Sequence, residues 1–568
     1  MKPVRLSAAA TIALPRWGLI ALCLLYILPG IIRRDPWKVD DATGFGMMWT
    51  MAHGSLNDWL TPNIVGLAMP SAAPLAYWIG ALLIRGLGWL TGDALAARFS
   101  ILIFFAIGVL AVWRTAFVLG RRSEAQPLKL AFGGQPAALD YGRTLADGAL
   151  LIYVASLGLL LRSHETAAAG LQVSLVAAVM YGAACVFDRP TLRAASGLGV
   201  ATGMLLLTTS WVAPLLLFVS LLMVALLRYR SALGNLLLVA LPISLLLPVA
   251  WLSARQLITG IDALDWFMVG WREIGPPSIG NLREVLKTFV WYAWPAWPIA
   301  AWAAYAWRAQ MTLHILLPLS AVVGLSAIAL IAPTIRDHGL LALLPPLAIL
   351  ATFGLPTLKR GAINAIDWFS VMTLSSIAGF IWLGWLAKQT GWPAQLAKNA
   401  FRAAPGFQPE FNTVALLIAL ATSLGWLLLL YWRLGRRPPV LWRAVVLSTG
   451  GSVLCWVLLM TLWLPWLNYR QSYASVAEQI STNLPVTYRC VDAHDLGPAQ
   501  RASFAYLGKV KFSQPGDKPC EYLLVQDDSL LGKGAQMKSV DKNLTLLWQG
   551  RRAADRYELF RLFRRDSP

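Results

Sequence analysis

The run WGLIALCLLYILPGIIRRDPWKVDD, residues 17–41, joins a long apolar stretch directly to a short segment of arginines and aspartates. Lys2, Arg5 and Arg16 precede the apolar stretch, in the way that basic residues precede the apolar part of a signal peptide. However, the stretch ends without a small-residue cleavage site, and further apolar runs follow it along the chain. We therefore expect an uncleaved first transmembrane helix that leads into a loop on the outer side of the membrane.

The composition of the whole chain agrees with a membrane protein. Of 568 residues, 57% are apolar and only 13% are charged, and the mean hydropathy is +0.59. A soluble domain carries about a quarter charged residues, so this composition excludes a soluble enzyme, a disordered chain and a DNA-binding protein. The net charge of +20 comes from basic residues that lie largely in short loops between apolar runs. The charge thus indicates membrane topology and not a nucleic-acid partner.

Apolar windows long enough to cross the hydrocarbon core recur along the chain. Residues 74–90 are apolar but interrupted, so they either cross the membrane or lie in its interface. Two further points stay open: whether residues 123–146 cross, and whether the run 195–228 is one span or a broken pair. We predict a mainly α-helical, polytopic bundle of about 13 spans. The windows are 17–32, 95–119, 145–161, 168–187, 195–228, 234–251, 289–307, 313–331, 339–355, 368–387, 412–431 and 442–464.

Basic clusters at every second connection predict the orientation of the bundle. They are Arg228/Arg230, Arg308, Lys359/Arg360 and Arg433/Arg436/Arg437/Arg443. Placing these clusters and the N-terminus in the cytoplasm puts residues 33–73 and everything after residue 464 outside. The chain then divides into a membrane domain, residues 1–464, with a first periplasmic loop at 33–73, and a periplasmic domain, residues 465–568.

The region 465–568 has frequent charges and no long apolar run, as in a small α/β domain. Its pattern predicts a helix at 472–480 and strands at 486–491, 521–525 and 557–563. Cys490 and Cys520 lie in or beside two of these strands, and an oxidising compartment permits a disulfide between them. The alternative is two buried free thiols. The other three cysteines fall in apolar spans.

The first outer loop carries the residues that point to chemistry. Two adjacent carboxylates, Asp40 and Asp41, follow the first span and precede an apolar, interfacial helix at 42–52. The motifs Arg34-Asp35-Pro36-Trp37-Lys38-Val39-Asp40-Asp41, Asn57-Asp58-Trp59-Leu60-Thr61-Pro62 and Pro74-Leu75-Ala76-Tyr77-Trp78 resemble, in order and spacing, those of the GT-C superfamily of membrane glycosyltransferases. The resemblance is to the aminoarabinose-transferase and protein-mannosyltransferase branch.

This resemblance implies a glycosyltransferase, a hexosyl- or pentosyltransferase of the bacterial inner membrane. Its donor is a sugar linked to polyprenyl phosphate, and its acceptor is lipid A, another glycan or a protein at the periplasmic face. Asp40 matches the leading aspartate of the superfamily and is implied as the base or acceptor-positioning group, and Asp41 replaces the usual glutamate. Asp147, in Arg143-Thr144-Leu145-Ala146-Asp147-Gly148, is similar to a second aspartate that opens a later span at the outer face, and is implied as the partner carboxylate.

The chain departs from the superfamily at three cations. Thr43, the neutral stretch 68–73 and Thr209 stand where the aminoarabinose branch has an arginine and two lysines that bind phosphate. Arg34, Arg336 and His338 lie in predicted outer segments and are candidates to hold the donor phosphate instead. Ser163-His164-Glu165 is interpreted as a solvated connection.

No Cys/His spacing predicts a metal site, and no cofactor is required for the reaction, although a divalent cation is compatible with it. The expected partners are the lipid-linked donor, the acceptor and membrane lipids. Two alternatives stay open: a transporter or flippase of lipid-linked sugars, and a catalytically inactive GT-C-like accessory protein. Transporters place ionisable groups near the midplane, whereas the acids of this sequence gather at the predicted outer face.

Overall fold

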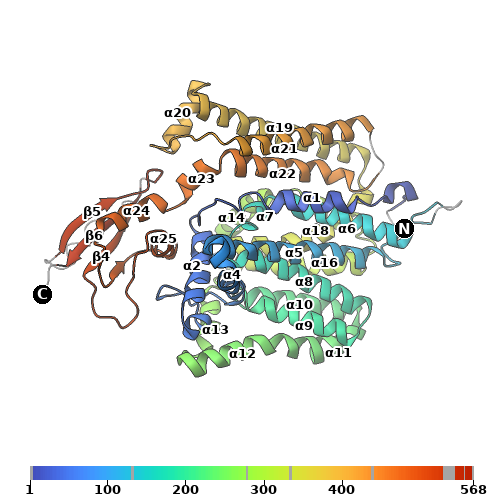
Figure 1. Cartoon of the computed structure of the whole chain (residues 1–568). Coiled ribbons are helices and arrows are strands. Elements are labelled where there is room, and N and C mark those ends of the chain that lie inside the picture. The colour runs from blue at the N-terminus through green and yellow to red at the C-terminus, as the bar shows by residue number, and fades with distance from the viewer. Residues whose placement is uncertain are drawn as a thin grey trace.

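The computed structural model describes residues 4–129, 134–276, 279–331, 336–436, 440–528, 544–555 and 557–565. The helices form an elongated bundle whose members run back and forth between two ends, with a small sheet beyond one of them (Figure 1). We call the end that carries residues 33–73 the loop end, and the opposite end, beside residues 4–15, the N-terminal end. The C-terminal sheet lies beyond the loop end (Figure 1).

The bundle is built from helices that are long or paired end to end. They are α1 (Arg16–Ile27), α5 (Asp93–Gly120), α6 (Ala138–Ala155), α7 (Leu157–Arg162), α8 (Ala168–Asp188), α9 (Leu192–Leu206), α10 (Val212–Arg228), α11 (Leu233–Asn235), α12 (Leu241–Thr259), α14 (Ile279–Tyr292), α15 (Ala296–Ala306), α16 (Leu313–Ile331), α17 (Arg336–Ala342), α18 (Leu344–Thr352), α19 (Arg360–Thr390), α21 (Thr413–Arg436) and α22 (Arg443–Leu462). Short turns of helix stand at η1 (Ala8–Thr11), η2 (Arg230–Ala232), η3 (Leu236–Ala240) and η5 (Leu355–Thr357).

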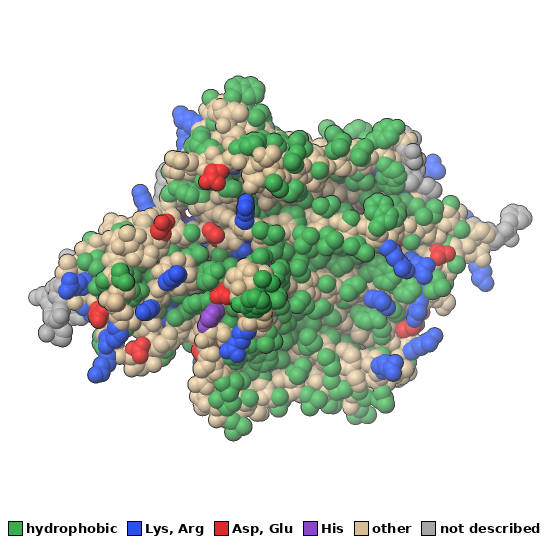
Figure 2. All heavy atoms as spheres, in the orientation of Figure 1, with side chains coloured by type: hydrophobic (Ala, Val, Ile, Leu, Met, Phe, Trp, Pro, Cys, Tyr) green, Lys and Arg blue, Asp and Glu red, His purple; other side chains and the backbone are tan. Residues whose placement is uncertain are grey.

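Length and composition identify six stretches of helix, within the described residues, as able to cross a membrane. They are Asp93–Gly120, Ala168–Asp188, Arg230–Thr259, Arg360–Thr390, Thr413–Gly435 and Arg443–Leu462, and shorter apolar helices accompany them. Figure 2 shows hydrophobic side chains over the flank of the bundle and charged side chains toward its two ends. This distribution fits a bundle whose flank faces lipid.

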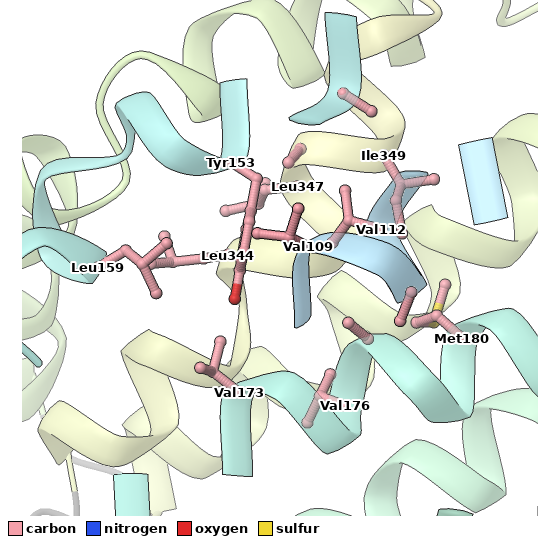
Figure 3. Packing of buried hydrophobic residues seen from close by; sticks show 14 of the residues in the cluster. Val109, Val112, Tyr153, Leu159, Val173, Val176, Met180, Leu344, Leu347 and Ile349 are labelled. Atoms are coloured by element: carbon pink, nitrogen blue, oxygen red, sulfur yellow. The ribbon is translucent and has the colours of Figure 1, made fainter. Parts of the chain in front are cut away.

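The centre of the bundle is packed through small residues. Helix α8 is rich in alanine, glycine and serine, and nearly all of its side chains are buried between α5, α9 and α18. At Gly108 of α5 an added Cβ would lie 2.8 Å from Ser174 Oγ, so the two helices touch almost backbone to backbone. Figure 3 shows Val109, Tyr153, Val176 and Leu347 meeting from four different helices. Close approach of this kind is how membrane helices gain dispersion energy without help from water.

The structure decides the three open points of topology. Residues 207–211 separate α9 from α10, so the run 195–228 is a broken pair. In the connection before α6 the described residues Leu128 and Gly134 both lie at the N-terminal end, because Leu128 N–H donates to Val4 O (2.9 Å) and Ala8 N–H to Gly134 O (2.9 Å). Helix α4 (Leu75–Thr91) begins and ends at the loop end and lies across it, next to α2 (Figure 1).

Short elements cover the loop end of the bundle. They are α2 (Asp40–His53), α3 (Leu56–Leu60), α13 (Ala263–Arg272), α20 (Ala394–Ala403), α23 (Leu464–Gln471) and the antiparallel pair β1 (Asn63–Ile64) and β2 (Leu67–Ala68). The interfacial helix expected at 42–52 corresponds to part of α2, which lies directly over the ends of α5 and α8.

The C-terminal region is a four-stranded sheet with two helices against it. The strand order is β3 (Val491–His494), β4 (Tyr522–Asp528), β6 (Glu558–Arg565), β5 (Leu544–Gly550); β3 and β4 are parallel and the other pairs antiparallel. The helices are α24 (Ala474–Asn483) and α25 (Pro498–Leu507). The strand expected at 486–491 begins only at Val491, where pairing with β4 starts, and β5 was not expected.

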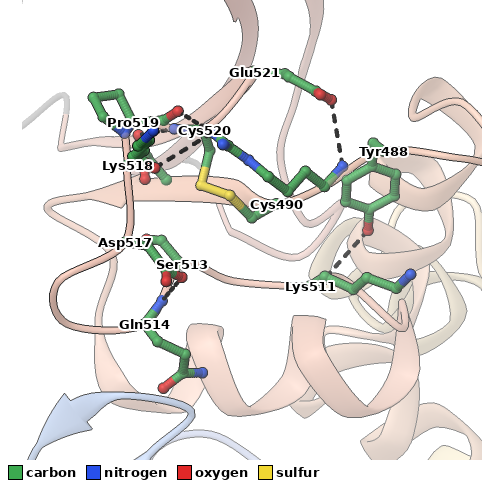
Figure 4. Close-up of a disulfide and its surroundings, with 12 residues drawn as sticks. Tyr488, Cys490, Lys511, Ser513, Gln514, Asp517, Lys518, Pro519, Cys520 and Glu521 are labelled. Atoms are coloured by element: carbon green, nitrogen blue, oxygen red, sulfur yellow. Dashed lines mark hydrogen bonds between the residues drawn. A yellow bond between two sulfur atoms is a disulfide. The ribbon is translucent and has the colours of Figure 1, made fainter.

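Two contacts tie this region together and to the loop end. Cys490 and Cys520, the predicted pair, form a disulfide between the residues that lead into β3 and β4 (Figure 4). Arg501 of α25 donates hydrogen bonds to Val65 O (2.6 Å) and Ser513 O (3.0 Å). Helix α25 also packs on α2, so the C-terminal region is docked through α25 against the helix that carries Asp40 and Asp41.

Candidate active site

Asp41, the second aspartate of the pair, is buried in an ion pair with Arg34. Arg34 Nη2 lies 2.9 Å from Asp41 Oδ2, and the two side chains are 0% and 1% exposed. Asp41 Oδ1 accepts hydrogen bonds from the backbone N–H and the hydroxyl of Thr166, each at 2.8 Å. Burial raises the pKa of Asp41, but the charges of Arg34 and Arg98 and the backbone hydrogen bonds outweigh it and hold that pKa below its ordinary value. Asp41 is thus ionised, and both of its oxygens are engaged.

Asp40 lies in different surroundings, on the first turn of α2. Its carboxylate pairs with Arg162, its side chain is 39% exposed, and it lines a cavity at the loop end. The same Arg162 Nη1 lies 3.0 Å from Glu165 Oε2. Asp40 therefore presents a carboxylate to an open space, while its counter-ion is shared with a second acid.

The cavity next to Asp40 has a volume of about 260 Å³, and both polar and apolar side chains line it. Its walls come from the loop 33–73, the start of α8, the break between α9 and α10, the end of α13 and the start of α17. Glu273 adds a second carboxylate. Within the described residues, Gln172 Oε1 and Glu273 Oε2 are buried without a hydrogen-bond partner. Polar side chains in the lining are Asp40, Thr43, Ser71, Tyr77, Gln172, Thr208, Thr209, Ser210 and Glu273.

Unpartnered buried oxygens next to a hydroxyl-rich wall suit a polyol ligand, because a sugar supplies several donors at once. Tyr77, from the third motif of the sequence, is one of the polar groups in this wall, together with Asp40. Thus two of the three motifs meet in one cavity.

Gly44 lets α2 approach the connection before α8. A Cβ at this position would lie 2.2 Å from the backbone oxygen of Thr166, which is far inside van der Waals contact. The close approach brings the N-terminal turn of α2 within reach of Thr166 and Arg162. Glycine at position 44 therefore positions Asp40 and Asp41 through packing.

The interpretation of Ser163-His164-Glu165 as a solvated connection is wrong. His164 and Glu165 are buried, and His164 Nε2 lies 2.8 Å from Tyr26 O. Burial raises the pKa of Glu165 to about 7, against the opposing charge of Arg162.

Asp147 does not join Asp40. Its carboxylate accepts hydrogen bonds from Leu14 N–H (2.8 Å) and Trp113 Nε1 (2.9 Å), and it lines a separate groove with Arg16 and Arg143. Helix α6 rises from the N-terminal end, and Asp147 is eight residues short of its far end at Ala155, or about 12 Å. The expectation that Asp147 is the partner carboxylate of Asp40 is therefore wrong.

The three residues predicted to bind the donor phosphate lie in different surroundings. Arg34 is wholly buried against Asp41 and His164 O, so the structure does not present it to the cavity. Arg336 and His338 lie on α17, and their side chains are outside the described residues. Gly339 of the same helix lines the cavity. Arg162, which the sequence analysis did not single out, is the described cation in contact with Asp40.

Metal-ligating groups are sparse in this part of the molecule. Among the residues that the structure describes, no three His, Cys, Asp or Glu side chains are grouped so that they could hold a metal ion. The chemistry open to the cavity from its own side chains is proton transfer by Asp40 or Glu273, and Arg162, which pairs with Asp40, adds a positive charge beside the cavity.

Comparison with known proteins identifies the fold. No protein-family model matches the chain, and no curated protein sequence matches it. Two solved structures of ArnT from Cupriavidus metallidurans, one bound to undecaprenyl phosphate and one in the apo state, superpose with a TM-score of 0.66. They are 15% and 14% identical in sequence, and each comparison covers 96% of this chain and 97% of ArnT. An oligosaccharyltransferase from Archaeoglobus fulgidus gives a TM-score of 0.44 at 12% identity, over 91% of this chain and 70% of that one. The chain therefore shares the fold of ArnT over nearly its whole length, in agreement with the resemblance that the sequence motifs indicated.

Proposed function

We propose that this protein is a glycosyltransferase that moves a sugar from a polyprenyl-phosphate carrier to an acceptor hydroxyl or amine. The observation that carries the proposal is the position of Asp40, whose carboxylate is partly exposed in a cavity at the loop end that also has several hydroxyl and amide groups in its lining. The shared fold supports the class of donor, because one of the superposed ArnT structures holds undecaprenyl phosphate. The flank of apolar helices supplies surface for a long prenyl tail.

Asp40 is the group proposed to accept the proton of the acceptor. As the acceptor oxygen or nitrogen bonds to the anomeric carbon, its proton passes to the Asp40 carboxylate and the bond to the carrier phosphate breaks. The phosphate leaves as a stable anion, so no general acid is needed. Attack from the face opposite the phosphate inverts the anomeric carbon.

Asp41 and Glu165 are proposed to position this machinery. Asp41 fixes the first turn of α2 through Arg34 and Thr166, so the neighbouring Asp40 has one orientation. Glu165 holds Arg162 in place beside Asp40. We assign Arg162 to the charge that develops on the leaving phosphate, together with Arg336 and His338 of α17.

The loop end is proposed to face the periplasm of a bacterial inner membrane. Arg121, Arg193, Arg228, Arg308 and Arg360 all lie at the opposite end, at connections between bundle helices. By the positive-inside rule this is the cytoplasmic end. The disulfide of the C-terminal region agrees, because disulfides persist in an oxidising compartment. The C-terminal sheet would then form a periplasmic domain over residues 465–568.

The test is a transfer assay in inner-membrane vesicles with radiolabelled polyprenyl-phosphate sugars and membrane acceptors. We expect Asp40→Asn to lower transfer at least about 100-fold, the usual contribution of a general base. The matched control is Asp140→Asn, since Asp140 is an exposed aspartate on the first turn of α6 at the far end of the bundle. Equal transfer by the wild type and Asp40→Asn would refute the role of Asp40. Parallel reactions with a chelator measure any requirement for a divalent cation.

A further inference from the structure

A second polar pocket lies at the N-terminal end, far from the Asp40 cavity. It has a volume of about 740 Å³ and is formed by the first turns of α19, the last turns of α21 and the start of α22. Its lining residues are Arg360, Asn364, Asp367, Trp368, Val371, Arg433, Leu434 and Arg443. Trp442, which precedes Arg443, shows that the pocket lies at the N-terminal end of the bundle, because Trp442 Nε1 donates to Ile12 O at 3.0 Å. Asp367 is seven residues into a 31-residue helix that ends at the loop end, so the two sites are separated by most of the bundle (Figure 1).

The pocket holds three guanidinium groups against one carboxylate. Asp367 and Arg433 form an ion pair, and both residues are 4% exposed. The charges of Arg433, Asp367 and Arg360 all act on Arg443, so the four groups form one electrostatic cluster. Since one carboxylate cannot neutralise three arginines, the lining has a net positive charge.

The ion pair leaves hydrogen-bonding capacity unused. Within the described residues, Arg433 Nε and Asp367 Oδ1 are buried and have no hydrogen-bond partner. A buried guanidinium N–H that lacks an acceptor costs free energy unless a ligand or water supplies one. Arg433 is thus a lining residue of the pocket, and its buried Nε–H is a donor that no described residue satisfies.

Two helix N-termini add to the positive potential. Helix α19 begins at Arg360 and α22 begins at Arg443, and both residues line the pocket. The free N–H groups of a helix N-terminus and its dipole favour an anion nearby. Arginines next to such N–H groups suit a phosphate, which accepts bidentate hydrogen bonds.

The rim of the pocket is apolar and open. Trp368 and Leu434 are 61% and 49% exposed, and Val371 lies one turn from Trp368 along α19. Helices α19 and α21 form the outermost layer of the bundle (Figure 1), with most of their apolar side chains exposed. A ligand here would meet cations at one part of the pocket and an apolar helix surface at the other.

We propose that this pocket binds an anionic membrane lipid in the leaflet at the N-terminal end. Its phosphate lies among Arg360, Arg433 and Arg443, and its acyl chains run along Trp368, Val371 and Leu434. The site is independent of the sugar-transfer reaction. A bound lipid would brace α19 and α21, which have few buried side chains of their own, against α22.

The test is native mass spectrometry of the full-length protein in detergent, titrated with phosphatidylglycerol or with phosphatidylcholine of the same acyl chains. We expect the first phosphatidylglycerol to bind at least about fivefold more tightly than phosphatidylcholine. Arg443→Gln and the exposed Arg360→Gln should each reduce this preference severalfold, because a charge-assisted hydrogen bond is lost. Arg193→Gln is the matched control, since Arg193 is exposed at the same end but outside the pocket.

Three outcomes would overturn the proposal. The preference could survive both pocket variants unchanged, or Arg193→Gln could weaken it as much as they do, which would indicate a diffuse surface effect. Inorganic phosphate alone could raise the thermal unfolding midpoint as much as phosphatidylglycerol does and lose that effect in Arg360→Gln, which would assign the pocket to a soluble phosphate. If Arg443→Gln does not fold, Arg360→Gln decides alone, because the Arg360 side chain is exposed.

Discussion

Asp40 and Asp41 are neighbours in the chain, but their carboxylates are 39% and 1% exposed and have separate arginine partners. Asp41 is locked between Arg34 and Thr166, whereas Asp40 opens onto the cavity. The division follows from the first turn of α2, where successive side chains point about 100° apart around the helix axis. Asp41 thus has a structural environment, whereas the Asp40 carboxylate is the one that reaches the cavity.

The buried pair predicts a stability difference between two conservative variants. Asp41→Asn removes the counter-ion of a fully buried arginine, so we expect a loss of about 3–5 kcal/mol in the free energy of unfolding. Asp40→Asn removes a partly exposed pair, and we expect a change below about 1 kcal/mol. Denaturant unfolding in detergent, followed by tryptophan fluorescence, measures both. An Asp41→Asn protein as stable as the wild type would show that the pair does not hold α2.

Glu165 predicts a pH dependence of stability. Its folded pKa, about 7, is above the ordinary 4.5 because of burial, so the folded protein binds the proton more tightly than the unfolded chain. The stability that comes from this group is complete below about pH 4.5 and is lost as the pH rises through 7. Between pH 5 and about 8 the thermal midpoint of the wild type should fall more steeply than that of Glu165→Gln. Parallel curves for the two proteins would contradict the burial effect.

Glycine 44 predicts a packing defect that reaches the active site. In Gly44→Ala the new Cβ would meet Thr166 O at 2.2 Å, so α2 must shift. Overpacking of this kind costs about 1–3 kcal/mol, and we expect sugar transfer to fall with it because Asp40 moves. Gly86→Ala in α4 is the control, since nothing lies within 4 Å of its Cβ and alanine is the better helix former. Full transfer activity in Gly44→Ala would mean that the site tolerates movement of α2.

The disulfide predicts a local stability effect in the C-terminal sheet. Cys490 and Cys520 are 30 residues apart. A disulfide that closes a loop of this length stabilises the folded state by about 3–4 kcal/mol, because it restricts the unfolded chain. The double variant Cys490→Ser/Cys520→Ser should therefore be cut faster by a protease within residues 491–565. Cys185→Ser serves as control, because Cys185 is a free thiol in α8. If a reductant leaves the wild-type cleavage rate unchanged, the bridge does not stabilise the sheet.

Particular residues show why part of the site was accessible from sequence and part was not. Asp40 and Tyr77 lie in contiguous motifs whose spacing resembles a known superfamily, and the structure brings both to one cavity. Arg162, Glu165 and Glu273 belong to connections with no motif, and only the packing of α7, α8 and α13 at the loop end brings them to Asp40. The prediction for Asp147 was wrong because a local motif does not indicate how far along α6 the residue lies. Arg34 lies in a motif that was correctly recognised, but it is buried in an ion pair with Asp41 and therefore stabilises the fold.

What the sequence by itself determined is the membrane-type helical fold, the cysteine pair and the aspartate that heads α2. These depend on local properties: the length of apolar runs, the charge of the connections, and motifs read within a few residues. The tertiary structure alone decided which of the two adjacent aspartates is exposed to the cavity and which arginine pairs with it. It also decided that α4 lies across the loop end. These depend on contacts between segments more than a hundred residues apart, such as Asp41 with Thr166, and burial created by such contacts changes a carboxylate from a reactive group into a structural one.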